Sequence, residues 1–320
     1  MKMDQGLAWM IASLVSMTGG TGFYYWALYM ADEKNTAMIA AGSEPTPGPE
    51  HKAEDKPEKK PEQKQEPDQE HVQEPHNKDH PQAHPKAPGK INAALPAPWN
   101  YQGSTGPRYW NRLDPAYLDC GSVRGQSPID LDNTKIDVKL KPLVFNYRDS
   151  NVVTTLRGQD LLATVSGNNF IEIEGDRYHL HSISIHTPSE HQLQSVPYEL
   201  EIQLNHRSAA GDLAVVAVFV AAGDANQDLQ LLLASLPRGD RDERELSGFP
   251  LIKLLPKKRT YFHYTGSQTT PPCTGNVAWY VFTTALEASS RDIERAVRLV
   301  INNSRPLQKA AGRGITRSNR

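Results

Sequence analysis

The chain has 320 residues, with 35 Lys and Arg against 37 Asp and Glu, so its formal net charge is −2. Two cysteines in a chain of this length exclude a small disulfide-rich scaffold, and the length allows one large domain or two small ones. From residue 91 onward acidic and basic residues nearly balance. This part has no basic field of the kind that binds phosphates, so we expect no nucleic acid partner.

An uncharged, apolar segment near the start of the chain extends from Gly6 to Ala31. It is longer than the roughly 20 residues that a helix needs to cross a bilayer. Aromatic residues gather toward its end and charged residues follow directly. We predict a transmembrane anchor over residues 1–35, with the membrane contacted through residues 6–31. The alternative is a cleaved signal peptide, which is disfavoured because the apolar stretch is too long and no small-residue cleavage site follows.

The next segment, residues 36–97, is rich in Pro, Glu, Lys and His and contains no aromatic residue from Ser43 to Pro98. Such a composition cannot bury a core, so we predict a disordered linker. Five histidines lie in it. Metal capture is possible because neutral imidazole is a good ligand, but their irregular spacing favours a solvated linker. These histidines are His51, His71, His76, His80 and His84.

From about Pro98 the sequence changes to short apolar or alternating runs such as FIEIEG and LAVVAVFV, separated by Gly, Pro, Asn and Asp. This pattern predicts a mainly β domain with short helices over residues 98–313. One helix is expected near the end, where Ser289 or Ser290 can cap an amphipathic stretch over residues 292–301.

Residues 314–320 are expected to form a basic tail. This end of the chain contains Lys309, Arg313, Arg317 and Arg320 and no acidic residue after Pro306. A frayed terminus is favoured over contact with anionic lipid or a partner.

Two predicted strands each carry a polar face, because side chains alternate between the two faces of a strand. Residues 178–191 read YHLHSISIHTPSEH, and residues 198–206 read YELEIQLNH. Two adjacent strands of this kind indicate a polar cleft within the domain. The first strand places Ser182, Ser184 and His186 on one face and His181, Ile183 and Ile185 on the other. The second places Glu199, Glu201, Gln203 and Asn205 on one face and Leu200, Ile202 and Leu204 on the other.

Four motifs appear in the order found in one known family: QSPID, HTPSEH, GSQTTPPC and NNSRPLQ. Through them the chain resembles the α-class carbonic anhydrases over essentially all of residues 98–313. The resemblance implies a large twisted, mostly antiparallel sheet, an active site in a cone-shaped cleft, and a few short helices outside.

That family holds a zinc ion on three histidines, two of which belong to an HFH tripeptide directly before the TPSEH sequence. Here the same tripeptide reads Ser184, Ile185 and His186, and the position of the third ligand is Gln203. The resemblance therefore implies ligand-equivalent positions at Ser184, His186 and Gln203. His181 and His206 lie close by but on the opposite faces of their strands, and only a β-bulge would turn either one toward the cleft.

One imidazole, one hydroxyl and one amide form a poor zinc site, because stable sites use Cys, His or carboxylate and catalytic sites need three protein ligands. We therefore expect no metal cofactor and no zinc catalysis. The family's proton-shuttle position is Gln159 here, and an amide does not titrate near pH 7.

The residues that surround the metal in the family are retained. The resemblance pairs Glu190 with Thr269, where a carboxylate orients a threonine hydroxyl, and makes Thr270 the substrate-side threonine. Glu201 matches the carboxylate behind the third histidine and would here support Gln203. Without a metal these residues are expected to stabilise the cleft through buried hydrogen bonds.

The two cysteines, Cys120 and Cys273, lie where bacterial relatives place a bridging pair. The resemblance thus implies a disulfide and an oxidising compartment, with two separate buried thiols as the alternative. This favours a single-pass membrane protein whose C-terminal domain is extracytoplasmic, most simply in a bacterial inner membrane facing the periplasm.

These features lead to the hypothesis of a membrane-anchored carbonic anhydrase-like protein without zinc catalysis. It would act as a binding or scaffold module or as an accessory subunit of a membrane complex, with protein partners in the membrane or outside the cytoplasm. The enzymatic alternative is an active zinc carbonic anhydrase that uses His186 with His206, Glu201 or Glu199. A third possibility is metal buffering by the linker histidines.

Overall fold

The computed structural model describes residues 96–122, 124–132 and 135–319. The predicted anchor and nearly all of the predicted linker, including its histidines, lie outside these residues. Among the described residues, no helix has the length and apolar character needed to cross a membrane.

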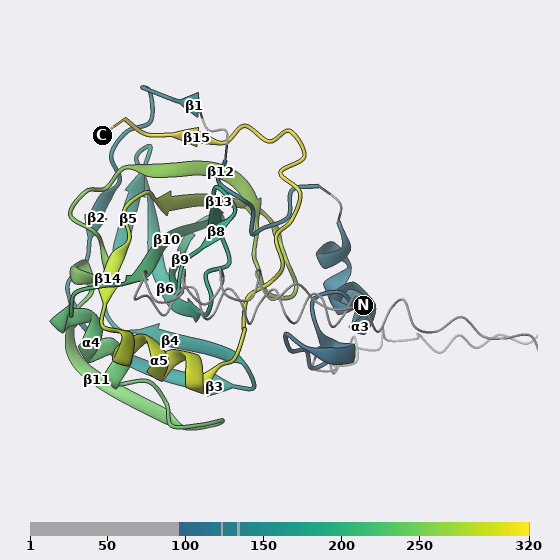
Figure 1. Ribbon diagram of the computed structural model, residues 1–320. Helices are drawn as coiled ribbons and strands as arrows, with labels where there is room; N and C mark the ends of the chain where they lie inside the picture. The colour runs from purple at the N-terminus through teal and green to yellow at the C-terminus, as the bar shows by residue number, and fades with distance from the viewer. Residues whose placement is uncertain (1–95, 123, 133–134, 320) are drawn as a thin grey trace, which may run out of the picture. The chain divides into compact units, whose positions relative to one another are not determined.

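The described residues are mainly β, as predicted, and most strands belong to one 13-stranded sheet (Figure 1). The strand order is β1-β15-β12-β13-β10-β9-β6-β4-β3-β11. Outside this order, β14 pairs with β10, β5 pairs with β6, and β2 pairs with β5. The strands are β1 (Lys135–Ile136), β2 (Val144–Asn146), β3 (Asp149–Arg157), β4 (Asp160–Val165), β5 (Phe170–Ile173), β6 (Asp176–His186), β7 (Gln192–Leu193), β8 (Val196–Pro197), β9 (Leu200–Ser208), β10 (Leu213–Ala222), β11 (Glu243–Pro250), β12 (Tyr261–Ser267), β13 (Gly275–Phe282), β14 (Leu286–Ala288) and β15 (Thr316–Arg317).

The helices are short. The predicted C-terminal helix is confirmed as α5, and the backbone N–H of Asp292 donates to the side chain of Ser289, so Ser289 is the cap. α4 follows the same rule with Asn226 as its cap, although the sequence analysis did not predict it. The helical segments are α3 (Trp110–Leu113), α4 (Gln227–Ala234), α5 (Ser290–Leu299) and the 3-10 turns η1 (Gly103–Thr105), η2 (Pro115–Gly121) and η3 (Leu251–Leu254).

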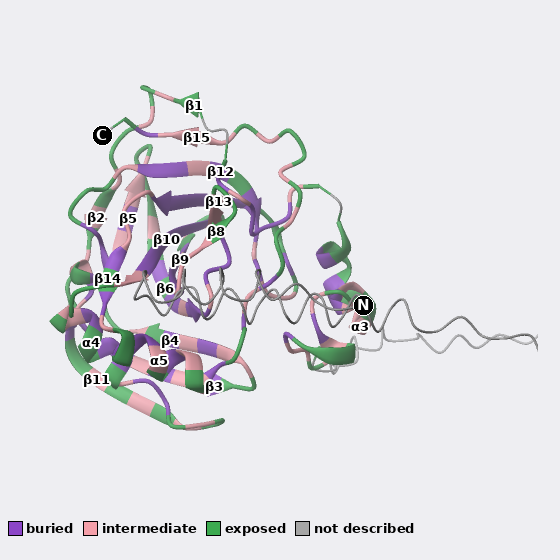
Figure 2. Cartoon of the chain, in the orientation of Figure 1, coloured by how far each residue is buried: buried purple, intermediate pink, exposed green. Residues whose placement is uncertain are grey.

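The central strand β10 separates two hydrophobic clusters, because its alternate side chains are buried on both faces. Val216 and Val218 enter the larger cluster, which includes residues of α4 and α5, whereas Val215 and Phe219 enter a smaller one with Trp279. Figure 2 shows β10 and β13 as largely buried. A continuous apolar run such as LAVVAVFV is what a strand covered on both faces requires.

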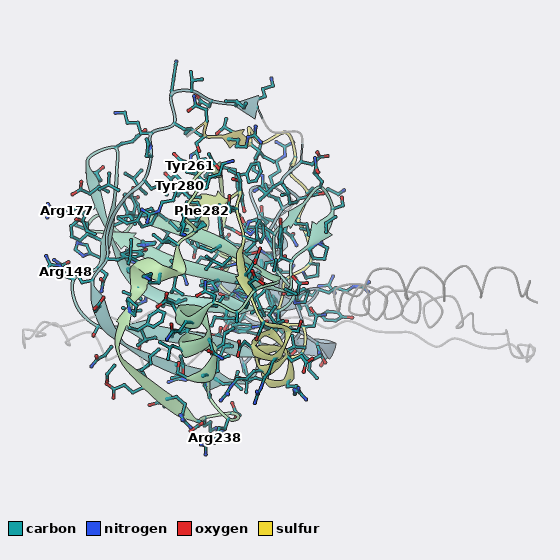
Figure 3. The ribbon with its side chains drawn as sticks, turned by 60° about the vertical axis from the view of Figure 1, so that its left-hand side comes forward. Arg148, Arg177, Arg238, Tyr261, Tyr280 and Phe282 are labelled. Atoms are coloured by element: carbon teal, nitrogen blue, oxygen red, sulfur yellow. A yellow bond between two sulfur atoms is a disulfide. The ribbon has the colours of Figure 1, made fainter. Side chains whose placement is uncertain are left out.

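The larger cluster is mostly aliphatic but contains several buried aromatic side chains. The rings of Tyr261 and Tyr280 meet edge to face with centroids 5.4 Å apart, and Phe282 is fully buried near them. Figure 3 labels these three residues in the interior and labels exposed arginines at the periphery. Such edge-to-face contacts add modestly to the stabilisation that burial provides.

The sheet extends beyond the predicted domain end at residue 313. β15 pairs with β12 and with β1, and so lies in the segment that was expected to be a basic tail. The guanidinium of Arg313 lies 5.5 Å from the ring centroid of Tyr264 and donates to nearby backbone carbonyls. The expectation of a frayed terminus was therefore wrong here, because backbone pairing and cation–π contact hold this segment.

Candidate functional site

The polar faces of β6 and β9 meet, as the alternation predicts. The two strands pair antiparallel, with Ser184 opposite Gln203 and His186 opposite Glu201. Leu200, Ile202 and Leu204 point into the larger hydrophobic cluster, so the intervening polar side chains of β9 occupy the other face. We call the group formed by Ser184, His186, Glu190, Glu201 and Gln203 the polar site.

Two carboxylates fix the amide of Gln203. Its Nε2 donates to Glu190 Oε2 at 2.7 Å and to Glu201 Oε1 at 3.0 Å. Both N–H groups of the amide are used in these bonds, and the carboxylates decide which end of the amide is nitrogen. The carbonyl Oε1 therefore points away from them. The support of Gln203 by Glu201 has the geometry that the sequence predicts.

The hydroxyl of Ser184 belongs to a short row of uncharged groups. Asn205 Nδ2 donates to Ser184 Oγ at 3.0 Å and to Ser182 Oγ at 3.3 Å. Ser184 is half-buried. An alcohol in this environment stays protonated near neutral pH, so it is a hydrogen-bonding group and a poor metal ligand.

His186 is buried and held from one side. Its Nδ1–H donates to the backbone carbonyl of Asn303 at 2.9 Å, and its Nε2 lies 3.6 Å from Glu190 Oε2. Nε2 forms no hydrogen bond with any described residue. The side-chain amide of Asn303 donates to the carbonyls of Ile185 and Gln159, which fixes the backbone on both sides. The Asn303 carbonyl therefore fixes the orientation of the His186 ring.

No hydrogen bond joins Glu190 to Thr269 among the described residues, and both carboxylate oxygens of Glu190 accept from other donors. Oε2 accepts from Gln203, and Oε1 accepts from the backbone N–H of Arg305 at 2.9 Å. Thr269 is buried and Thr270 is half-buried. The amide of Gln203 is thus one of two donors that hold the carboxylate of Glu190.

A buried chain of hydrogen bonds leads away from Glu201. Its Oε1 accepts from His191 Nδ1–H at 2.8 Å, and His191 Nε2 accepts from the Tyr264 hydroxyl at 2.6 Å. The Tyr264 oxygen lies 2.8 Å from Ser127 Oγ. Burial tends to raise the pKa of Glu201, but the electrostatic interaction and the hydrogen bonds with His191 outweigh it and lower that pKa. The structure thus places His191 in the polar network, and it adds Tyr264 and Ser127, which the sequence analysis missed.

Gln159, which the resemblance places at the family's proton-shuttle position, is used in structural contacts. Its Nε2 donates to the carbonyl of Ile301 at 3.0 Å, and its Oε1 accepts from the backbone N–H of Tyr101 at 3.2 Å. The neighbouring Asp160 is half-buried, and its desolvation raises the pKa of its carboxyl group. The side chain at position 159 therefore joins three segments of the chain.

The histidines proposed as substitute ligands lie elsewhere. A β-bulge does occur in β6, between Leu180 and Ser182, but His181 at this bulge is exposed. His206 lies on the opposite face of β9, where its Nε2 accepts from the Tyr147 hydroxyl at 2.6 Å. Burial lowers the pKa of His206 to about 3. Within the described ranges, no group of three or more His, Cys, Asp or Glu side chains could hold a metal ion.

The predicted disulfide between Cys120 and Cys273 is confirmed. It lies beside Arg305, whose guanidinium donates to the carbonyls of Cys120 and Ser127 at 2.9 and 2.7 Å. Burial lowers the pKa of Arg305 to about 10. The sequence analysis did not single out Asn303 or Arg305, although both belong to the NNSRPLQ motif that it quoted.

Comparison with known proteins identifies close similarity to one family. Residues 105–319 match the model of the eukaryotic-type carbonic anhydrases. A carbonic anhydrase of Nostoc sp. is 32% identical over 216 residues, which cover 66% of this chain and 82% of that protein. One from Klebsiella pneumoniae is 32% identical over 221 residues, covering 68% and 89%.

Two solved structures agree with this similarity. The α-carbonic anhydrase of Thermovibrio ammonificans, in complex with the inhibitor sulfanilamide, has a TM-score of 0.67 and 31% identity, covering 69% of this chain and 99% of that one. Dioscorin complexed with ascorbate has a TM-score of 0.64 and 31% identity, covering 69% and 97%.

Proposed function

The chain belongs to the eukaryotic-type carbonic anhydrase family, and we propose that it is a member without zinc catalysis that acts as a membrane-anchored binding or scaffold module. In this proposal residues 6–31 form the anchor and the family domain lies outside the cytoplasm. The disulfide between Cys120 and Cys273 supports an oxidising compartment.

The donor chemistry at three positions carries the proposal. His186 offers one imidazole nitrogen, while Ser184 offers an alcohol and Gln203 an amide oxygen. The N–H groups of Gln203 donate to Glu190 and Glu201, so both carboxylates act as acceptors for this amide. Catalytic zinc sites use three ligands drawn from His, Cys and carboxylate. The residues present therefore do not fit zinc, and we assign no reaction step to a metal.

Metal analysis of the purified, untagged full-length chain tests the loss of zinc. We expect no stoichiometric zinc and no hydration of carbon dioxide above background. The double variant Ser184→His/Gln203→His should bind about one zinc per chain, because it completes a three-histidine set in which Glu201 stands behind position 203.

A matched double variant, Ser182→His/Asn205→His, places two imidazoles on the same strands but away from the expected ligand set, and it should not gain the same tight zinc binding. One zinc per wild-type chain, together with sulfonamide-sensitive hydration of carbon dioxide, would establish the enzymatic alternative instead.

The scaffold role is tested by its dependence on the anchor. Affinity purification of the full-length protein from its own membranes should recover defined companions. Exchange of residues 1–35 for an unrelated transmembrane helix should remove those companions while the domain remains folded. If the same companions persist after the exchange, the anchor is not the partner-binding element. If none are recovered with the native anchor, the accessory-subunit proposal fails.

A further inference from the structure

Beside His186, whose Nε2 has no hydrogen-bond partner among the described residues, the site face of β6 and β9 carries hydroxyl and amide side chains. Four side chains, which we call the polar row, lie on this face: Ser182, Ser184, Gln203 and Asn205. Ser182 stands opposite Asn205, and Ser184 stands opposite Gln203. Directly opposed residues of an antiparallel pair share one face, with Cβ atoms about 4.5–5.5 Å apart.

Counting donors and acceptors shows what the polar row has left to offer. Asn205 uses both N–H groups on the oxygens of Ser182 and Ser184, which leaves its Oδ1 as an acceptor and both serine O–H groups as donors. Gln203 uses both N–H groups on carboxylates, which leaves its Oε1 as an acceptor. Two donors and two acceptors therefore remain. The pair Ser182 and Asn205 has one donor and one acceptor, and so does the pair Ser184 and Gln203.

The two carboxylates next to the polar row already accept hydrogen bonds from other groups of the protein. Glu190 and Glu201 are buried, and their oxygens accept from Gln203, His191 and the backbone of Arg305. The next strand, β4, places the half-buried Leu162 opposite Ser184 and so adds an apolar contact beside the row. A charged ligand would find no free partner of opposite sign in the polar row itself.

From this arrangement we propose that the polar row binds a neutral polyhydroxylated molecule, a sugar or another polyol, as the ligand of the binding module proposed above. Each hydroxyl of such a molecule both donates and accepts, so neighbouring hydroxyls satisfy the serine O–H groups and amide oxygens together. The C–H surface of the ligand covers Leu162. This inference rests on the proposed function, in which the site holds no zinc, since a metal there would reorganise Gln203.

The proposal is tested on the full-length protein with a series of linear polyols that carry two to five hydroxyl groups: ethylene glycol, glycerol, erythritol and xylitol. Selective ¹⁵N labelling of Asn and Gln makes the side-chain amides of Asn205 and Gln203 visible by NMR, with Asn205→Ala and Gln203→Glu to assign them. We expect saturable shifts of both signals and an affinity that rises along the series as more hydroxyls are engaged.

Ser184→Ala should weaken xylitol binding about three- to tenfold, because it removes one of the two donors. Ser247→Ala is the matched control, since Ser247 is exposed on β11 and should leave the affinity unchanged. Absence of a saturable shift with every polyol would overturn the inference, as would equal affinity in Ser184→Ala. If the chain carries no zinc, either of these results contradicts polyol binding but leaves the proposed loss of catalysis unaffected. Stoichiometric zinc would contradict both proposals.

Discussion

Gln203 and His206 are three positions apart on β9, and this odd spacing puts their side chains on opposite faces of the sheet. Gln203 reaches the two carboxylates of the polar site, whereas His206 stacks on Tyr147 with ring centroids 6.1 Å apart. A histidine only three residues from a ligand position is therefore no substitute for it while the strand stays regular.

Burial of His206 predicts a pH-dependent stability. Its pKa falls to about 3 in the folded protein, compared with about 6.5 in an unfolded chain. Below pH ~6.5 the unfolded state binds a proton that the folded state does not, so this residue lowers the free energy of unfolding progressively as the pH falls toward 3. Its neutral form imposes no such penalty above pH ~6.5.

His206→Gln should remove this contribution while keeping a polar partner for Tyr147. Denaturant unfolding between pH 7 and pH 4.5 should show the wild type losing stability relative to the variant, with a limiting slope of about 1.4 kcal/mol per pH unit. The control is His181→Gln, which changes an exposed imidazole of the same sheet. Parallel pH profiles for wild type and His206→Gln would contradict the assignment.

At the scale of strands and helices, strong local sequence patterns were sufficient to predict the elements that they define. The alternation in residues 178–206 predicted which polar side chains share a face, and the capping serine and apolar spacing predicted α5. The start of α4 was missed because its single cap, Asn226, precedes a run of leucines that also suits a buried strand. Short apolar runs leave this ambiguity.

Elements that depend on distant partners could not be predicted from local sequence. β15 has two residues and exists because β12 and β1 offer free backbone groups on either side. The donors that occupy Glu190 likewise come from Gln203 on β9 and from Arg305 near the C-terminus. Sequence resemblance supplied the positions of the site residues, but it implied a bond from Glu190 to Thr269 that is not found among the described residues.

At the scale of the whole molecule, one covalent bond joins the start of the described domain to the connection between β12 and β13 in the sheet that carries the site. Cys120 belongs to η2, and Cys273 precedes β13, 153 residues further along the chain. Arg305 donates to the carbonyl of Cys120, and its own backbone N–H donates to Glu190. The disulfide therefore braces the segment that supports the polar site.

Removal of this bond should destabilise the domain strongly, because the cross-link closes a long loop and restricts the unfolded chain. For Cys120→Ala/Cys273→Ala we expect a loss of about 2–5 kcal/mol in the free energy of unfolding, measured by denaturant titration under oxidising conditions. A reductant should lower the stability of the wild type toward that of the variant and leave the variant unchanged. Equal stability of wild type and variant would mean that the packing of Arg305 and the neighbouring aromatic residues Tyr101, Trp110 and Tyr117 holds this end of the domain without the covalent link.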